Sequence, residues 1–124
     1  MNIHADQDLM EQVWLNLITN AIKYTSSKGQ VTIGMKLEIT DIVVRIQDTG
    51  KGIPEGAIPK LFDRFYKVDK ARSSSTNGSG LGLSIAKRIL DIHHFPIEII
   101  SEQGIGSIFI VRIPNRNNTL EGLS

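Results

Sequence analysis

Three polar side chains recur at helical spacing near the start of the chain. Asn16, Asn20 and Lys23 lie three or four residues apart, so a helix presents them on one face. Amides are poor residues for a helix interior, and on an otherwise apolar helix they need an external partner or water. An amide oxygen is a hard ligand that suits Mg²⁺, which takes its other ligands from waters and phosphates. This face is a candidate metal and phosphate site, and a solvated polar face is the alternative.

A carboxylate followed by two glycines forms a second candidate. Asp48-Thr-Gly50-Lys-Gly52 comes directly after a run of β-branched residues. Glycines there allow the backbone to approach a ligand closely. A carboxylate at position 48 can accept a hydrogen bond from the exocyclic amino group of adenine, whereas guanine presents an acceptor at that place. A turn without any ligand explains the same residues equally well.

Two further glycine clusters differ in what they indicate. Gly78-Ser-Gly80-Leu-Gly82 leads into a helical pattern, so free backbone amides and the helix dipole offer a site for an anion such as a triphosphate. A flexible connector would look the same. No strand precedes it, as a dinucleotide-binding loop requires, and no Gly-Lys-Ser/Thr phosphate loop occurs. Gly104-Ile-Gly106 is most simply a hairpin turn.

These candidates need elements that position them. Periodicity predicts helices over 6–24 and 81–92, a short helical stretch over 58–65, and strands over 31–37, 42–47, 97–100 and 107–113. The first two strands form a hairpin that turns near Thr40-Asp41. The polar segment 67–79 is typical of a mobile loop. This order predicts an α/β (α+β) two-layer sandwich, a mixed sheet of about five strands with about three helices on one face.

Composition excludes several classes of protein. A length of 124 residues suits one domain, predicted over 1–114, and the unpatterned residues 115–124 are predicted to be a disordered tail. The formal charge of +1, without a basic stripe, argues against nucleic acid as a partner. The absence of cysteine excludes disulfides and zinc–thiolate sites. No apolar run is long enough to span a bilayer, so the expected location is cytoplasmic.

Taken in order, the motifs resemble those of the GHKL ATPase superfamily, and the sensor histidine kinases match best. They are Asn-Leu-x-x-Asn-Ala-x-Lys-Tyr from Asn16, Asp-x-Gly-x-Gly-Ile from Asp48, Phe-Asp-Arg-Phe-Tyr from Phe62, and Gly-Leu-Gly-Leu from Gly80. The resemblance covers roughly residues 6–114 and implies a Bergerat-type fold that binds ATP and Mg²⁺.

The resemblance also implies a role for each matching residue. Asn20 is expected to coordinate Mg²⁺, and Asn16 and Lys23 to face the phosphates. A lid over about 67–79 is expected to supply two cations. The implied catalytic set is Asn16, Asn20, Lys23, Lys67 and Arg72. The implied nucleotide-binding set is Asn16, Asn20, Lys23, Tyr24, Asp48, Gly50, Gly52, Ile53, Phe65, Gly80, Leu81, Gly82 and Leu83.

The function implied is transfer of the ATP γ-phosphoryl group to a histidine on a separate dimerisation domain, for relay to a response regulator. The parent kinase is expected to be anchored in the cell membrane, and the isolated domain to be monomeric. A hydrolysing GHKL ATPase is one alternative, although such proteins carry a Glu general base where this chain has Asn16. A non-catalytic ATP-sensing module is the other.

One departure from the resemblance concerns the end of the second long helix. Many members have His-Gly-Gly where this chain has His93-His94-Phe95, so that turn is expected to differ. Neither histidine is expected to be catalytic, because the turn lies at the far end of the helix that begins at the expected phosphate site. We therefore expect both histidines to have structural roles.

Overall fold

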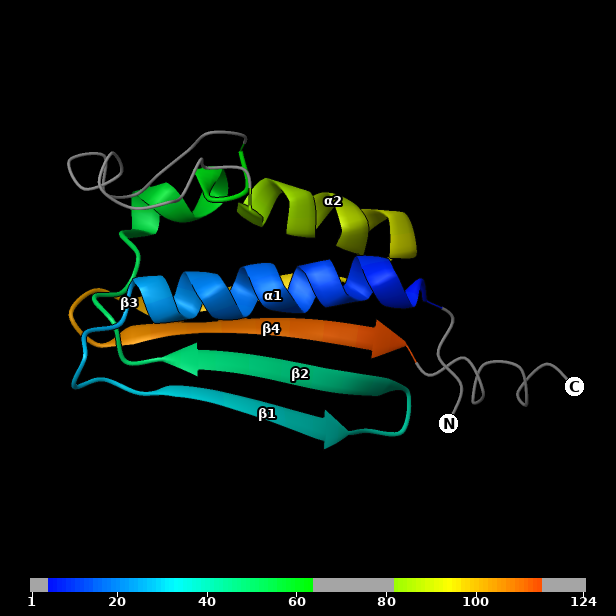
Figure 1. The fold of residues 1–124 in the computed structure, drawn as a ribbon, viewed down its shortest axis with the longest axis horizontal. Coiled ribbons are helices and arrows are strands. Elements are labelled where there is room, and N and C mark those ends of the chain that lie inside the picture. Colours follow the sequence, from blue (N-terminus) through cyan, green and yellow to red (C-terminus); the bar gives the residue numbers. More distant parts are fainter. Residues whose placement is uncertain (1–4, 64–81, 115–124) are drawn as a thin grey trace, which may run out of the picture.

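The fold pairs one antiparallel sheet with a layer of helices on one of its faces (Figure 1). The computed structural model describes residues 5–63 and 82–114. In chain order the elements are α1 (Gln7–Lys23), β1 (Val31–Leu37), β2 (Asp41–Asp48), the 3-10 helix η1 (Glu55–Lys60), α2 (Gly82–His93), β3 (Ile97–Glu102) and β4 (Gly106–Pro114). The predicted two-layer α/β sandwich is confirmed.

Helix α1 begins and packs as its sequence predicts. The side chain of Asp6 caps it by accepting a hydrogen bond from the backbone N–H of Leu9 at 3.0 Å. The apolar residues at its core-facing positions are buried, namely Met10, Val13, Leu17 and Ala21. Their spacing of three or four residues places one stripe against the sheet and leaves the opposite flank in solvent.

The sheet has fewer strands than the sequence suggested. Within residues 5–63 and 82–114 it contains four strands in the order β1-β2-β4-β3, where about five were expected. It is also antiparallel where a mixed sheet was expected. Strands β2 and β3 run in the same direction, but β4 lies between them and opposes both. Every hydrogen-bonded neighbour is therefore antiparallel, and no parallel pair forms.

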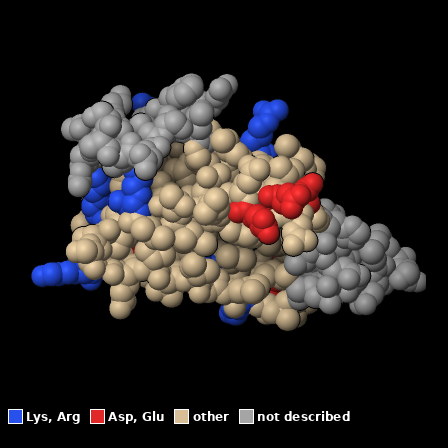
Figure 2. All heavy atoms as spheres, in the orientation of Figure 1, with Lys and Arg blue, Asp and Glu red and all other residues tan. Residues whose placement is uncertain are grey.

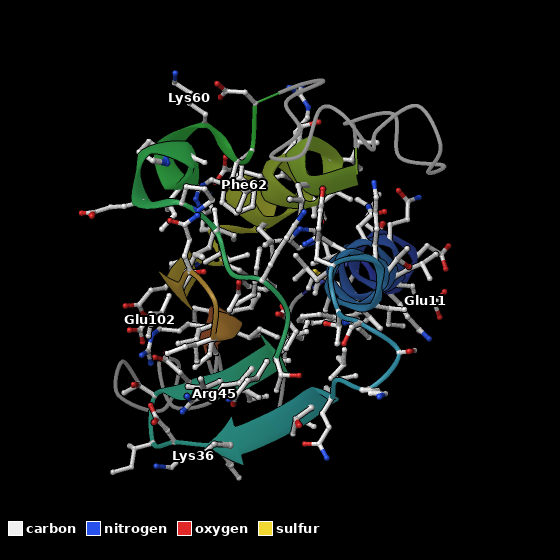
Figure 3. The ribbon with its side chains drawn as sticks, turned by 90° about the vertical axis from the view of Figure 1, so that its left-hand side faces the viewer. Glu11, Lys36, Arg45, Lys60, Phe62 and Glu102 are labelled. Atoms are coloured by element: carbon white, nitrogen blue, oxygen red, sulfur yellow. The ribbon has the colours of Figure 1, made fainter. Side chains whose placement is uncertain are left out.

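The core lies between this sheet and the two long helices. Alternate residues of the central strands face α1 and α2, and the buried ones are Ile42, Ile46, Phe109, Val111 and Ile113. Helix α2 contributes Ala86, Ile89 and Leu90 to the same cluster. Figure 3, viewed along the strands from one end, shows both helices on the same side of the sheet. This packing fixes the ends of α1 and β2 next to each other.

The short helical stretch differs from the expectation for 58–65. It is a 3-10 helix that occupies Glu55–Lys60 and contains Pro59. Proline provides no backbone N–H for a continuing helix, so only a short, tight helix forms. Phe62 packs against the core, as expected for an aromatic residue there, and lies beside η1 and α2 (Figure 3).

The turn after α2 carries two larger side chains where the resemblance leads us to expect glycines, and only the second of them is buried. His94 adopts a φ of 61°, the left-handed region that glycine occupies most easily. Phe95 is only 2% exposed and lies in the core. The ring of His93 accepts a hydrogen bond at Nε2 from the N–H of Asp6 at 3.0 Å, and its Nδ1 lies 2.8 Å from the carbonyl of Ile89. Both polar contacts support a structural role for His93 at the start of α1.

Among the described residues, no helix combines the length and the apolar character that crossing a membrane requires. The predicted tail, 115–124, and the predicted loop, 67–79, lie outside the described ranges.

Candidate functional site

A pocket lies where the second half of α1, the loop after β2 and the start of β4 meet. Its lining contains five residues that the sequence singled out: Asn20, Tyr24, Asp48, Gly52 and Ile53. Lys51, Leu61, Ser107 and Phe109 complete it. We call this the base pocket, after the nucleotide base that the sequence resemblance leads us to expect there. Its volume is about 20 Å³, close to the space of one water molecule, so a larger ligand requires side chains to move.

Asp48 is a buried carboxylate at the floor of the base pocket. It ends β2, is 5% exposed, and pairs with Ser107 of β4 in the sheet register. Its Oδ1 accepts a hydrogen bond from the backbone N–H of Gly50 at 2.8 Å. Burial raises the pKa of Asp48 above its ordinary value, while backbone hydrogen bonds from Gly50 and Ser107 oppose that rise. A carboxylate held in this way is suited to recognise a hydrogen-bond donor on a ligand.

Two glycines bring the loop after β2 close to its neighbours. Gly52 has a φ of 75°, and a β-carbon there would collide with the backbone carbonyl of Glu102. A β-carbon at Gly50 would collide with the carbonyl of Tyr24. Only glycine therefore allows the loop to lie against the ends of both α1 and β3.

A pair of serines, which the sequence interpretation missed, supports the same loop. The hydroxyl of Ser101 accepts a hydrogen bond from the N–H of Ile53 at 2.7 Å and donates to the carbonyl of Gly106 at 3.2 Å. It also lies 3.0 Å from the hydroxyl of Ser107. Either of the two hydroxyls can donate in this contact. The one available signal was the position of Ser107 directly after Gly106.

The polar face of α1 points toward the start of α2. A β-carbon at Gly82 would lie 3.4 Å from Oδ1 of Asn16, so the two residues are neighbours. Asn20, one turn further along α1, lines the base pocket. The structure thus places the base pocket, Asn20, Asn16 and the first residue of α2 in a row.

Lys23 and Gly50 lie next to the base pocket but do not line it. Both line a second cavity, which is bounded by the end of α1 and the loop after β2. The ammonium groups of Lys23 and Lys51 lie 5.5 Å and 5.3 Å from the centre of the Tyr24 ring. Figure 2 shows basic atoms gathered toward the end of the molecule where α1 ends.

The fold and these sequence motifs occur together in a known family. The family described as histidine kinase-, DNA gyrase B- and HSP90-like ATPases matches residues 5–117. The chain belongs to this ATPase family. The resemblance inferred from the motifs is therefore confirmed.

Within this ATPase family the chain is homologous to the catalytic domains of sensor histidine kinases. The sensor protein SrrB of Staphylococcus aureus is 42% identical over 109 residues, which cover 88% of this chain and 19% of that protein. The chain thus spans about a fifth of the length of the curated relatives it matches.

Solved structures of histidine kinases are similar to this chain in fold. The mycobacterial sensor histidine kinase MprB has a TM-score of 0.80 at 27% identity, covering 90% of this chain and 76% of that chain. The catalytic domain of histidine kinase ThkA, in a nucleotide-free form, has a TM-score of 0.75 at 34% identity, covering 90% and 71%. Full-length ShkA in complex with AMPPNP has a TM-score of 0.74 at 29% identity, covering 90% and 22%.

Several residues expected to act in an ATPase of this kind lie outside the described ranges. These are Phe65, Lys67, Arg72, Gly80 and Leu81. Leu83 is described, and it packs against the hydrophobic core. No group of three or more His, Cys, Asp or Glu side chains in residues 5–63 and 82–114 could hold a metal ion. Asn20 offers a single amide oxygen, and one such ligand suits a Mg²⁺ ion that takes most of its ligands from phosphates and water.

Proposed function

We propose that this chain binds ATP together with Mg²⁺ and transfers the γ-phosphoryl group to a histidine on a separate dimerisation domain. The observation that carries the proposal is the base pocket, in which the buried carboxylate of Asp48 lies between apolar walls. Adenine presents an amino group from which Asp48 can accept a hydrogen bond, whereas guanine would place an oxygen against the carboxylate. The complex of the similar kinase ShkA with AMPPNP supports the choice of an adenine nucleotide.

The row of residues beyond the base pocket supports the path of the triphosphate. With the base beside Asp48, the phosphates extend along α1 past Asn20 toward Asn16 and Gly82. The backbone amides at the start of α2 and its dipole favour negative charge there. Mg²⁺, when bound at the oxygen of Asn20, supplies charge neutralisation for the transferred group. The contributions of Lys23, Lys67, Arg72, Gly80 and the other predicted residues remain predictions.

Phosphoryl transfer is favoured over hydrolysis by the identity of residue 16. An amide cannot take a proton from water, so Asn16 cannot act as the general base that a hydrolysing relative needs. We therefore expect the chain alone to hydrolyse ATP poorly. The nucleophile is a histidine of the partner domain, from which a response regulator then receives the phosphoryl group. A membrane-anchored parent kinase of this kind would carry the catalytic domain on its cytoplasmic side.

Transfer from radiolabelled ATP tests this function. The chain is mixed with the helical dimerisation domain of its parent kinase, and acid-labile label on that domain is counted. Asn20→Ala is expected to reduce transfer by about a hundred-fold or more, because it removes the proposed metal ligand. Gln47→Ala is the matched control, since it removes an exposed amide next to Asp48 in the sequence.

Three results would contradict the proposal. Phosphoryl transfer that is unchanged in Asn20→Ala would show that Asn20 is not the metal ligand. Label on the chain alone would point to a histidine within it as the acceptor. Steady release of inorganic phosphate by the chain alone would favour a hydrolysing ATPase.

A further inference from the structure

Ser101 of β3 contacts two residues of the base pocket without lining the pocket itself. Its hydroxyl oxygen lies 2.7 Å from the backbone nitrogen of Ile53 and 3.0 Å from the hydroxyl oxygen of Ser107. Ile53 and Ser107 both belong to the pocket lining. Any effect of Ser101 on a ligand in the base pocket therefore acts through these two residues.

The side chain of Ser107 lies beside that of Asp48 at the floor of the base pocket. The two residues are directly opposite each other in the register of β2 and β4, so their side chains share one face of the sheet with β-carbons about 5 Å apart. Both residues are 5% exposed. A carboxylate only accepts hydrogen bonds, whereas a hydroxyl can donate or accept. Of these two neighbouring groups, only the hydroxyl of Ser107 can adapt to the ligand.

Adenine requires the hydroxyl of Ser107 to donate. The amino group of adenine and its ring nitrogen N1 are neighbours on one edge of the base, the first a donor and the second an acceptor. Guanine presents an oxygen and an N–H at the same two places. When Asp48 accepts from the amino group, the group beside Asp48 must supply a proton to N1. The direction of the Ser107 hydroxyl therefore contributes to the choice of base.

Ser101 controls which way the proton of Ser107 points. A serine hydroxyl carries one proton, and the proton of Ser101 has two acceptors within reach. These are the carbonyl of Gly106 at 3.2 Å and the hydroxyl of Ser107 at 3.0 Å. When Ser101 donates to Gly106, the contact between the two hydroxyls uses the proton of Ser107. When Ser101 donates to Ser107, the proton of Ser107 is available to a ligand.

We propose that Ser101 is a positioning residue for adenine recognition, an inference that rests on the proposed function. Ser101 accepts the N–H of Ile53 and donates its own proton to Ser107, which then donates to N1 of adenine next to Asp48. Hydrogen bonds that run in one direction along such a chain polarise and strengthen one another. The backbone of the loop after β2 thereby sets the donor that the base meets.

Calorimetry with ATP and with 1-deaza-ATP, both with Mg²⁺, tests the inference. In 1-deaza-ATP a C–H group replaces the ring nitrogen N1, so the acceptor is missing. Ser101→Ala is expected to weaken ATP by about ten-fold, the loss of one to two hydrogen bonds, and 1-deaza-ATP by less than about two-fold. A purely structural role of Ser101 would weaken both nucleotides equally. Thr32→Ala, which removes an exposed hydroxyl from β1, is the matched control and is expected to change neither affinity.

A second pair of variants separates the hydroxyl from the shape of the side chain. Ser101→Thr and Ser101→Val introduce side chains of the same shape, and only the first keeps the hydroxyl. Both are β-branched and suit a strand, so they give the test even if Ser101→Ala fails to fold. Ser101→Thr is expected to bind ATP within about three-fold of the unsubstituted chain, and Ser101→Val about ten-fold more weakly. Urea denaturation shows that each variant is folded.

Two outcomes overturn the inference and leave the proposed function intact, provided that the unsubstituted chain binds ATP. Equal weakening of ATP and 1-deaza-ATP by Ser101→Ala would show that Ser101 only supports the loop. Equal ATP affinities of Ser101→Thr and Ser101→Val would show that its hydroxyl is not used. A different result, failure of the unsubstituted chain to bind ATP, would overturn the proposed function and the inference together.

Discussion

The two ends of helix α1 are built on different principles. At its beginning, Asp6 caps the helix, His93 accepts the N–H of Asp6, and Phe95 fills the space against the core. At its end, Tyr24 and the loop after β2 surround a buried carboxylate, Asp48. Several basic side chains lie toward the second end in Figure 2, although others project elsewhere, and the main acidic group visible in that view lies toward the first end.

The difference separates stability from binding. At the first end, polar groups form hydrogen bonds with one another and an aromatic ring is buried. Both lower the free energy of the folded state. The second end keeps a carboxylate away from water, although burial disfavours its charged form. An arrangement that is unfavourable without a ligand and complementary to a hydrogen-bond donor is typical of a binding site. Substitutions at the two ends should therefore have different consequences.

The largest effect on stability is expected at the first end. Phe95→Ala removes a nearly fully buried ring and should lower the free energy of unfolding by about 3–5 kcal/mol. Denaturation by urea measures it, and Ile92→Ala, at a position 61% exposed, is the matched control with an effect within about 0.5 kcal/mol. The folded Phe95→Ala chain should bind ADP with nearly unchanged affinity. A large loss of ADP affinity would contradict the view that the first end serves stability and the second end serves binding.

An intermediate effect on stability is expected at the second end. Gly52→Ala introduces a side chain at a positive φ and against the carbonyl of Glu102, which should cost about 1–3 kcal/mol of stability. It should also weaken ADP by at least about ten-fold, because the loop must move away from the pocket. Gly34→Ala, where a β-carbon meets no atom within 4 Å, is the control. Equal behaviour of the two variants in calorimetry and thermal unfolding would contradict the role of the loop.

The smallest effect concerns pH. Because the folded state raises the pKa of Asp48, the unfolded chain releases this proton first as pH rises. The contribution of Asp48 to stability is therefore greatest below its ordinary pKa of about 4 and falls as pH rises through the raised value. Asp48→Asn removes this loss of stability at higher pH. The free energy of unfolding of the variant, relative to that of the unsubstituted chain, should therefore increase with pH over that window. Urea denaturation at several pH values measures the difference, and a difference that is constant with pH would contradict the buried charge.

Local patterns predicted the elements that hold the site. Apolar spacing gave α1, and the alternating runs on either side of residues 40–41 gave the β1–β2 hairpin that ends at Asp48. The carboxylate and the glycines after it were predicted from residue type, because few residues tolerate such close backbone contacts. These features depend on neighbours in the sequence, so periodicity and composition are sufficient to find them.

Features that depend on distant pairing were missed. The number and direction of the strands required knowing that β4 lies between β2 and β3. Ser107 looked like an ordinary strand residue, and Ser101 lay just beyond the predicted strand 97–100. Only the register that pairs Ser107 with Asp48 brings Ser107 to the pocket, with Ser101 beside it. Likewise, Lys51 was treated as a spacer between two glycines. Its position over Tyr24 depends on the approach of two segments that are far apart in the sequence.

Calorimetry of ATP and GTP in the presence of Mg²⁺ tests the central claim most directly. If Asp48 recognises the amino group of adenine, ATP binds and GTP binds about a hundred-fold more weakly or not at all, because two acceptors would face each other. Asp48→Asn should weaken ATP and narrow the difference between the nucleotides while the chain stays folded. Binding of GTP as tightly as ATP would contradict the role of Asp48 and with it the assignment of the base pocket.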